Sequence, residues 1–410
     1  MQKGLWGKWT SISLVKRILV FLVIGVILGL VCPRVTVIGI VGNIFVGALK
    51  AVAPLLVFFL IMSSLCHATE THSGIIKTVI ILYMFSTLLA SVLAVFASKI
   101  FPVQMILADA SDAMDAVAPS GIAEVLENLL MNAVQNPVAA LVNSNYIGIL
   151  TWAVLIGVAL RGANDGVKIA LDGLSTAISL VVKSIIELAP FGILGLVFTS
   201  ISTSGLNIFV DYGKLILLLV GCMLFIYFVT NPILVFWCIR KNPYPLIFKS
   251  LKESAITAFF TRSSAANIPV NMKICEEMGL DRDTYSVTIP LGATINMDGA
   301  AITITVMTLA TCNTLGIPVD IPTGIVLSVL AALSACGASG VAGGSLLLIP
   351  MACSLFGIPD TVSMQVVAVG FIIGVIQDSV ETALNSSSDL ILSASAEFKQ
   401  WRLEGKEIKF

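Results

Sequence analysis

Four carboxylates lie inside apolar stretches in the second half of the sequence. They are Asp298, Asp378, Glu381 and Asp389, and the segment 283–398 that contains them has no lysine or arginine. An unpaired carboxylate in hydrocarbon costs at least about 2.5–3.5 kcal/mol, even on lenient scales. Three ways of avoiding this cost are open: the acids are protonated, they pair with an arginine from elsewhere in the chain, or they bind a cation from outside.

The last apolar segment carries a stripe of polar side chains at helical spacing. The positions 3, 4, 7 and 11 residues after Asp378 are Glu381, Thr382, Asn385 and Asp389. At about 100° per residue these positions share one face of a helix, which is predicted to face the protein interior. Helix–helix hydrogen bonding would account for Thr382 or Asn385 alone, but not for three acids. The opposite side carries Ile376, Val380, Ala383, Leu384 and Leu390.

The stretch "GATINMDG" at 292–299 places polar groups between two apolar runs. Gly292 and Gly299 bracket a place where a helix can open, and opening frees carbonyl groups around Asn296. Freed carbonyls together with the Asp298 carboxylate form an all-oxygen cage that suits a hard cation such as Na⁺ rather than a soft metal. The alternative, a kink without an ion, leaves Asp298 unpaired.

Two further segments predict helical hairpins that enter the membrane without crossing it. Residues 253–279 are too polar at Arg262–Asn267 to cross, and residues 324–357 contain the small-residue tip "ACGASGVAGG". Non-helical backbone at membrane depth indicates a transport site when it occurs in paired segments. The hairpin tips expose backbone N–H groups that attract a carboxylate. An amino acid would offer its carboxylate to the tips and its ammonium to Asp378.

The composition predicts the surroundings of these elements. Of 410 residues, 57% are hydrophobic and 11% are charged, against about 25% charged in soluble domains. We therefore predict an all-α polytopic membrane protein in a lipid bilayer, and a net charge of −1 suggests no nucleic-acid partner. The apolar stretches before residue 250 are 15–32, 39–66, 75–101, 138–160, 174–203 and 212–239.

The distribution of charge indicates the orientation. Basic residues cluster before the first stretch, after the fourth and sixth, and at the end of the chain. The loop 102–137 carries only acidic charges: Asp109, Asp112, Asp115, Glu124 and Glu127. Because basic loops stay in the cytoplasm, both termini are predicted to be cytoplasmic and this loop extracytoplasmic.

Together, "TRSSAANIP" at 261–269, "GATINMDG", the small-residue second hairpin and the D-x₃-T-x₂-N-x₃-D pattern of the last helix resemble the dicarboxylate/amino acid:sodium symporter (glutamate transporter) family. The resemblance implies eight transmembrane helices plus two re-entrant helical hairpins, a homotrimer in the bacterial cytoplasmic membrane, and elevator-type alternating access. It implies scaffold helices 1–2 in residues 1–74 and 4–5 in residues 138–203, and a transport domain in residues 75–101 and 204–410. Within 204–410 it implies helix 6, hairpin 253–282, broken helix 284–314, hairpin 321–358, helix 360–397 and a cytoplasmic tail.

The resemblance also implies roles for individual residues. Asp378 would bind the substrate ammonium, and Asn385 with Ser263 and Ser264 would bind the carboxylate. Thr382 and Glu381 would complete the substrate site, with Gly340 closing as a gate. Na⁺ would be the coupling ion. Its first site would use Gly292, Asn296, Asn385 and Asp389; a second would use Asn296, Asp298, Tyr83, Ser86 and Thr87; a third would use Thr294 and carbonyls near Ala338.

One departure from the family pattern predicts the substrate. Members that take acidic substrates have an arginine three residues after the ammonium-binding aspartate, and here Glu381 stands there. A second substrate carboxylate would meet like charge, whereas a hydroxyl could donate to Glu381. We therefore predict Na⁺ symport of the small neutral hydroxy amino acids serine and threonine. Other departures are Gly374, where the family often has an acid, and Ala335 and Ala338, which replace hydroxyl residues.

Several alternatives remain open from the sequence. The same fold could couple transport to protons through Asp298 or Asp389, or could carry acidic amino acids or dicarboxylates. Arg262 could pair with Asp378 or face cytoplasmic water. An enzyme is disfavoured, because Asp378 and Asp389 are about three helical turns apart, too far to share a proton.

Overall fold

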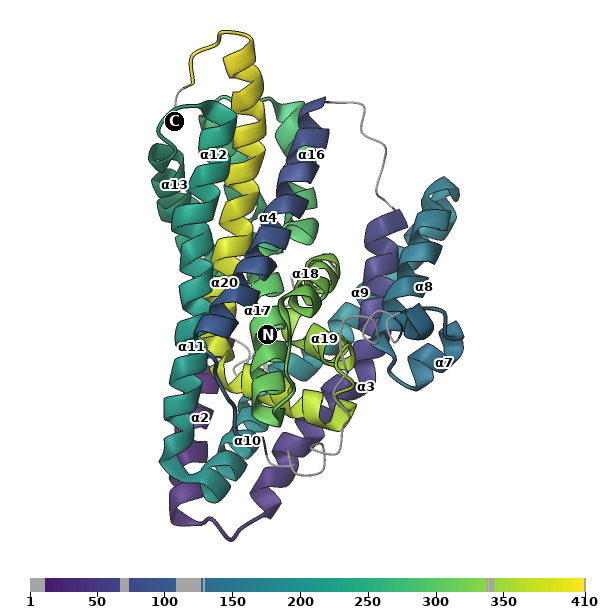
Figure 1. Ribbon diagram of the computed structural model, residues 1–410, viewed down its shortest axis with the longest axis vertical. Coiled ribbons are helices and arrows are strands. Elements are labelled where there is room, and N and C mark those ends of the chain that lie inside the picture. Colours follow the sequence, from purple (N-terminus) through teal and green to yellow (C-terminus); the bar gives the residue numbers. More distant parts are fainter. Residues whose placement is uncertain are drawn as a thin grey trace, which may run out of the picture.

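The computed structural model describes residues 12–66, 74–107, 127, 130–336, 338 and 343–408, and these residues form helices joined by short turns, without strands (Figure 1). Helices long and apolar enough to cross a membrane are Val37–Ser63, Gly74–Ile100, Asp165–Glu187, Ile208–Ile239, Arg282–Leu315 and Asp360–Leu403. The prediction of an all-α, multi-pass membrane protein is thereby confirmed.

The first half contains α2 (Leu14–Val31), α3 (Val37–Cys66) and α4 (Gly74–Ile100), close to the predicted stretches. The stretch 138–160 divides into α7 (Pro137–Val142) and α8 (Tyr146–Ala159). The prediction of a single span at 174–203 was wrong.

That stretch contains the end of α9 (Asp165–Glu187) and most of α10 (Ala189–Ser204). Pro190 lies in the first turn of α10, where its missing N–H removes a bond to the preceding turn and the helix restarts.

The sixth stretch is continuous through α11 (Ile208–Phe225), the π-helical turn η3 (Ile226–Thr230) and α12 (Asn231–Ile239). The first hairpin begins earlier than predicted. Its first arm runs through α13 (Tyr244–Ser250), the π turn η4 (Leu251–Ala255) and α14 (Ile256–Thr261).

The second arm is α15 (Ser264–Glu277). The tip is only Arg262 and Ser263, narrower than the predicted Arg262–Asn267, because Ser263 caps α15 and the residues up to Asn267 already form its first turn.

The broken helix consists of α16 (Arg282–Ile295) and α17 (Asp298–Leu315), with the break at Asn296 and Met297. The second hairpin comprises α18 (Ile321–Ala335), η5 (Ser345–Leu348) and α19 (Ile349–Ser354). The chain continues into α20 (Asp360–Leu403), which extends beyond the predicted end at 397.

The helices form two groups by their contacts. In one, α2 packs on α10, and α3 packs on α8, α9 and α10. In the other, α20 is surrounded by α4, α11, α12 and the helices α14 to α17 and α19. The groups meet where Lys50 of α3 forms an ion pair of 2.8 Å with Asp360 of α20, and where the rings of Phe45 and Phe371 lie 5.3 Å apart.

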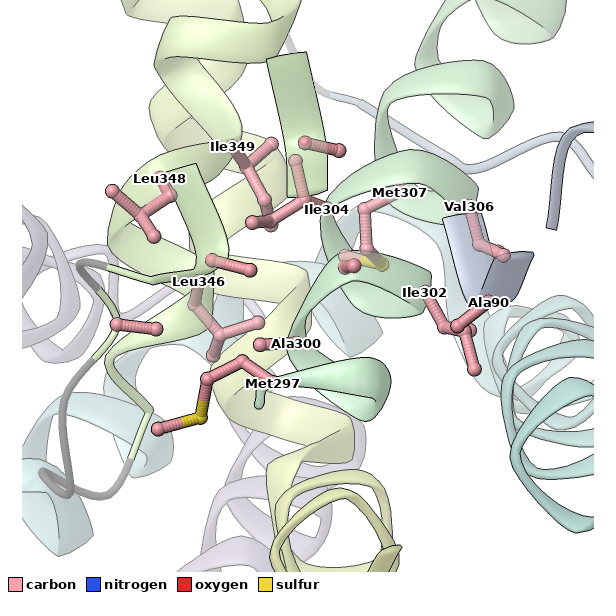
Figure 2. Packing of buried hydrophobic residues seen from close by; sticks show 14 of the residues in the cluster. Ala90, Met297, Ala300, Ile302, Ile304, Val306, Met307, Leu346, Leu348 and Ile349 are labelled. Carbon is pink, nitrogen blue, oxygen red and sulfur yellow. The ribbon is translucent and has the colours of Figure 1, made fainter. Parts of the chain in front are cut away.

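Helices α17 and α20 form the core of the second group. Figure 2 shows Ile302 and Val306 of α17 beside Ala90 of α4, while Ile304 of the same helix points toward Ile349 of the second hairpin. The core also encloses more of α20 than the sequence predicted. Leu384 and Leu390, assigned to the side opposite the polar stripe, are buried, whereas Ile376 is exposed.

Candidate functional site

The polar stripe of α20 faces the interior, as its spacing predicted. Its members are all at least 90% buried: Asp378, Glu381, Thr382, Asn385 and Asp389. The elements that reach this stripe include the tip of the first hairpin, the start of α17 and the start of the second hairpin's returning arm. Every one of these contacts joins residues that are distant in sequence.

Asp378 is held by both hairpins. The Arg262 guanidinium lies 2.6 Å from its Oδ2 atom, and the backbone N–H of Gly343 donates to Oδ1 over 3.1 Å. Arg262 also donates to the carbonyl of Gly374 over 3.4 Å. The residue ends α14 in the left-handed conformation, with φ of 52°, which turns its side chain toward α20. The alternative that Arg262 faces water is therefore excluded in this structure.

A small cavity adjoins this ion pair. Its volume of about 10 Å³ is about enough for one water molecule. Arg262, Asp378 and Gly343 line one side, and Ile18 of α2 and Ala189 of α10 line the other. An amino acid does not fit here unless the guanidinium or the second hairpin moves.

Glu381 is surrounded by neutral donors. Its Oε2 atom accepts hydrogen bonds from Thr303 over 2.7 Å, from Ser345 over 2.9 Å and from the amide of Gln377. The sequence interpretation missed all three partners. Gln377 could have been suspected, because it precedes Asp378 in an otherwise apolar turn, but no local pattern relates Thr303 or Ser345 to α20.

Asp389 and Asn296 meet at the break between α16 and α17. The Asn296 amide donates to Asp389 Oδ1 over 2.9 Å, and the hydroxyl of Tyr83 donates to the Asp389 carbonyl over 2.9 Å. The carbonyl of Gly292 still accepts the Asn296 N–H, over 2.9 Å. Asn296 Oδ1 is buried and has no hydrogen-bond partner among the described residues. This unpartnered oxygen beside a carboxylate fits a hard cation.

The two glycines of "GATINMDG" lie within helices, on either side of the break. A Cβ atom on Gly292 would lie 2.7 Å from Asp389 Oδ1, and one on Gly299 would lie 3.0 Å from the Cα of Glu381. Glycine is therefore needed at both positions for close contact with α20. The opening itself occurs at Asn296.

Asp298 is paired with α4. Ser86 donates to its Oδ2 over 2.8 Å and Thr87 to its Oδ1 over 3.0 Å. Tyr83, predicted for the same ion site, instead donates to the carbonyls of Asp389 and Thr288. Tyr83 therefore contacts Asp389, which was predicted for the first ion site, rather than Asp298.

Hydrogen bonds to residues three positions away involve three other predicted site residues: Ser263, Thr294 and Ala338. Ser263 caps α15 by accepting from the N–H of Ala266 over 3.2 Å, and Ser264 is buried beside it. The hydroxyl of Thr294 donates to the carbonyl of Leu291 over 2.7 Å.

Ala338 donates its N–H to the Ala335 carbonyl over 2.8 Å. The thiol of Cys336 lies 3.6 Å from the Ile295 carbonyl, which brings the end of α18 next to Thr294. Gly340 lies outside the described residues.

The acids differ in how their charge is compensated. Among the ion pairs of the described residues, Asp378 has a basic partner but Asp298, Glu381 and Asp389 do not. Asp298 and Glu381 are held by hydroxyl and amide donors, and Asp389 by one amide. Among the four acids, and within the described part of the chain, an arginine thus compensates the charge of Asp378 only.

Comparison with known proteins identifies the group to which the chain belongs. A family described as the sodium:dicarboxylate symporter family matches residues 14–397. A protein of Streptococcus thermophilus (strain CNRZ 1066) named serine/threonine transporter SstT is 56% identical over 394 residues, which is 96% of this chain and 98% of the relative.

Proteins of the same name from two other species are about as similar. The one from Bifidobacterium adolescentis is 54% identical over 99% of this chain and 94% of the relative. The one from Streptococcus agalactiae serotype Ia is 57% identical over 95% of this chain and 96% of the relative. The chain therefore belongs to the sodium:dicarboxylate symporter family, whose members are transporters rather than enzymes.

Proposed function

We propose that this protein imports serine and threonine together with Na⁺ across the bacterial cytoplasmic membrane. The observation that carries the proposal is the buried pair of carboxylates Asp378 and Glu381, one helical turn apart on α20. Asp378 suits an ammonium group, and Glu381 suits a hydroxyl donor and repels a second carboxylate. The names of the similar proteins support the same substrates.

The amino acid would replace the contacts that now hold Asp378. Its ammonium takes the place of the Arg262 guanidinium at Asp378, and its carboxylate binds Asn385 and the N-terminus of α15 at Ser263 and Ser264. The Oδ1 atom of Asn385 already accepts the Gly299 N–H over 2.7 Å. The side-chain amide therefore has N–H groups to donate to a carboxylate. Thr382 completes the site.

Na⁺ would be the coupling ion at the residues around the break in α16 and α17. The first site combines Asp389 with carbonyls of Gly292, Asn296 and Asn385. The second combines Asp298 with Asn296 and the hydroxyl groups of Ser86 and Thr87 in α4, whereas Tyr83, also predicted for this site, donates to the Asp389 carbonyl. The third combines Thr294 with carbonyls near Ala338. The unpartnered Asn296 Oδ1 atom supports a cation in this region.

We further propose that the two groups of helices are a scaffold (residues 1–74 and 138–203) and a transport domain (residues 75–101 and 204–410). The α13–α15 and α18–α19 pairs would be re-entrant hairpins, the second of which opens as a gate. The assembly would be a homotrimer, with both termini in the cytoplasm.

The contact between the two groups supports an elevator movement. With the N-terminus in the cytoplasm, α2 runs toward the outer surface and α3 runs back. Lys50 is 13 residues after Val37, so it lies about 20 Å from the outer end of α3 toward the cytoplasm. Asp360 begins α20 at the outer end of the transport domain, yet it pairs with Lys50. In Figure 1 the loop between α2 and α3 lies at one end of the long axis, whereas α4 ends nearer its middle. A transport domain displaced toward the cytoplasm would have this geometry.

The decisive experiment is uptake of labelled L-serine by proteoliposomes that contain the purified full-length chain. Uptake is measured at fixed pH with an inward Na⁺ gradient and with choline in place of Na⁺. We expect Na⁺-dependent uptake that unlabelled threonine reduces and glutamate does not. Equal rates in Na⁺ and choline would contradict sodium coupling, and inhibition by glutamate alone would contradict the substrate assignment.

A further inference from the structure

The start of the returning arm of the second hairpin contacts both carboxylates of the proposed substrate site. The backbone N–H of Gly343 donates to Asp378 over 3.1 Å, and two residues later the Ser345 hydroxyl donates to Glu381 over 2.9 Å. A nitrogen donor at Asp378 and a hydroxymethyl group at Glu381 are also what a bound serine would present. The hairpin therefore offers these acids the same kinds of donor as the proposed substrate.

The space beside the Oε2 atom of Glu381 is occupied by its three donors. Ser345 is 1% exposed, and Thr303 and Gln377 are not exposed at all. The three donors converge on one carboxylate oxygen from η5, α17 and α20. A second hydroxymethyl group cannot reach Oε2 while Ser345 stays in place, because interiors are packed without voids of that size.

Of the three donors, Ser345 is the one that can leave. Thr303 and Gln377 belong to long helices, and the Gln377 amide also donates to the Thr303 hydroxyl over 2.7 Å. Ser345 instead begins a 3₁₀ turn directly after the hairpin tip. Its departure requires movement of one arm of the hairpin only.

We propose that the Ser345 hydroxyl and the substrate hydroxyl alternate at Glu381. Serine displaces Ser345 and replaces its hydrogen bond to Glu381, so the exchange contributes little to the free energy of binding. Alanine, which has no hydroxyl, leaves Ser345 in place, and Glu381 keeps its three donors. Ser345 is thus a specificity-determining residue that lets the site accept substrates without a hydroxyl. This inference rests on the proposed function.

The test is calorimetric binding of L-serine and L-alanine to the purified full-length protein at saturating Na⁺. In Ser345→Ala, serine gains a hydrogen bond to Glu381 without breaking one. We therefore expect its Kd to fall about 10-fold while that of alanine stays unchanged. Ser345→Cys, a weaker donor of similar volume, is expected to show a smaller fall and serves if the alanine variant does not fold.

The matched control is Ser354→Ala in the same hairpin arm, whose hydroxyl donates to the Met351 carbonyl over 2.6 Å. It is expected to bind both amino acids as the wild type does. An unchanged or higher serine Kd in Ser345→Ala, or an equal change for serine and alanine, overturns the alternation and leaves the proposed function standing. A wild type that binds neither serine nor threonine overturns both.

Discussion

Replacing Arg262 by alanine tests whether the guanidinium competes with the substrate ammonium for Asp378. The pair is 2.6 Å apart, and the two side chains are 10% and 5% exposed. Removing one partner of a buried ion pair costs about 3–5 kcal/mol. In Arg262→Ala this cost falls on the substrate-free state, in which the Gly343 N–H is the one hydrogen-bond partner that Asp378 keeps among the described residues.

Serine binding to the wild type must separate the same pair. If about 1.4 kcal/mol of that cost is recovered on binding, the Kd for serine falls tenfold. We therefore expect Arg262→Ala to be less stable to heat without substrate and to bind serine at least tenfold more tightly. Calorimetry on the purified protein at saturating Na⁺ gives the Kd, and thermal unfolding with and without serine gives the stability.

Arg240→Ala is a matched control. Arg240 also ends a helix in the left-handed conformation, with φ of 56°, but it is exposed at the end of α12. Arg240→Ala therefore has the same effect on the backbone as Arg262→Ala, but it removes no ion pair to α20. If Arg262→Ala bound serine with the same Kd as Arg240→Ala, competition at Asp378 would be ruled out.

Three further substitutions test the site in proteoliposomes. Asp378→Asn should abolish serine uptake while the protein still inserts in the membrane, and normal uptake would remove Asp378 from the ammonium site. Glu381→Arg should weaken serine uptake and admit an acidic substrate, and unchanged uptake would show that Glu381 does not contact the ligand. Gly292→Ala should raise the Na⁺ concentration for half-maximal uptake, because its Cβ would lie 2.7 Å from Asp389 Oδ1; an unaltered Na⁺ dependence would separate this contact from ion binding.

The errors in predicting the fold have a common cause. Boundaries were misplaced where an apolar run continued through a break, as at the junction of α9 and α10, or where a helix began before the run did, as at Tyr244. Hydropathy reports burial in lipid or protein but not backbone direction. In the same way, Leu390 and Ile376 have similar hydropathy, although Leu390 is buried and Ile376 is exposed.

The sequence by itself determined the features that depend on local geometry. A helix repeats every 3.6 residues, so the spacing of Asp378, Glu381, Thr382, Asn385 and Asp389 was enough to place them on one face. The glycine and asparagine residues of "GATINMDG" were likewise enough to locate the break. The absence of basic residues over 283–398 indicated that these acids are protonated, pair with an arginine from elsewhere or bind a cation.

Only the tertiary structure decided which partners those are. Arg262 meets Asp378 across 116 residues, Ser86 meets Asp298 across 212, and Tyr83 meets the Asp389 carbonyl across 306. Such contacts depend on how separate helices pack, and no periodic pattern within one helix carries that information. The sequence therefore showed that the carboxylates must be compensated, while the packing of α4, the hairpins and α17 around α20 determined the compensating groups.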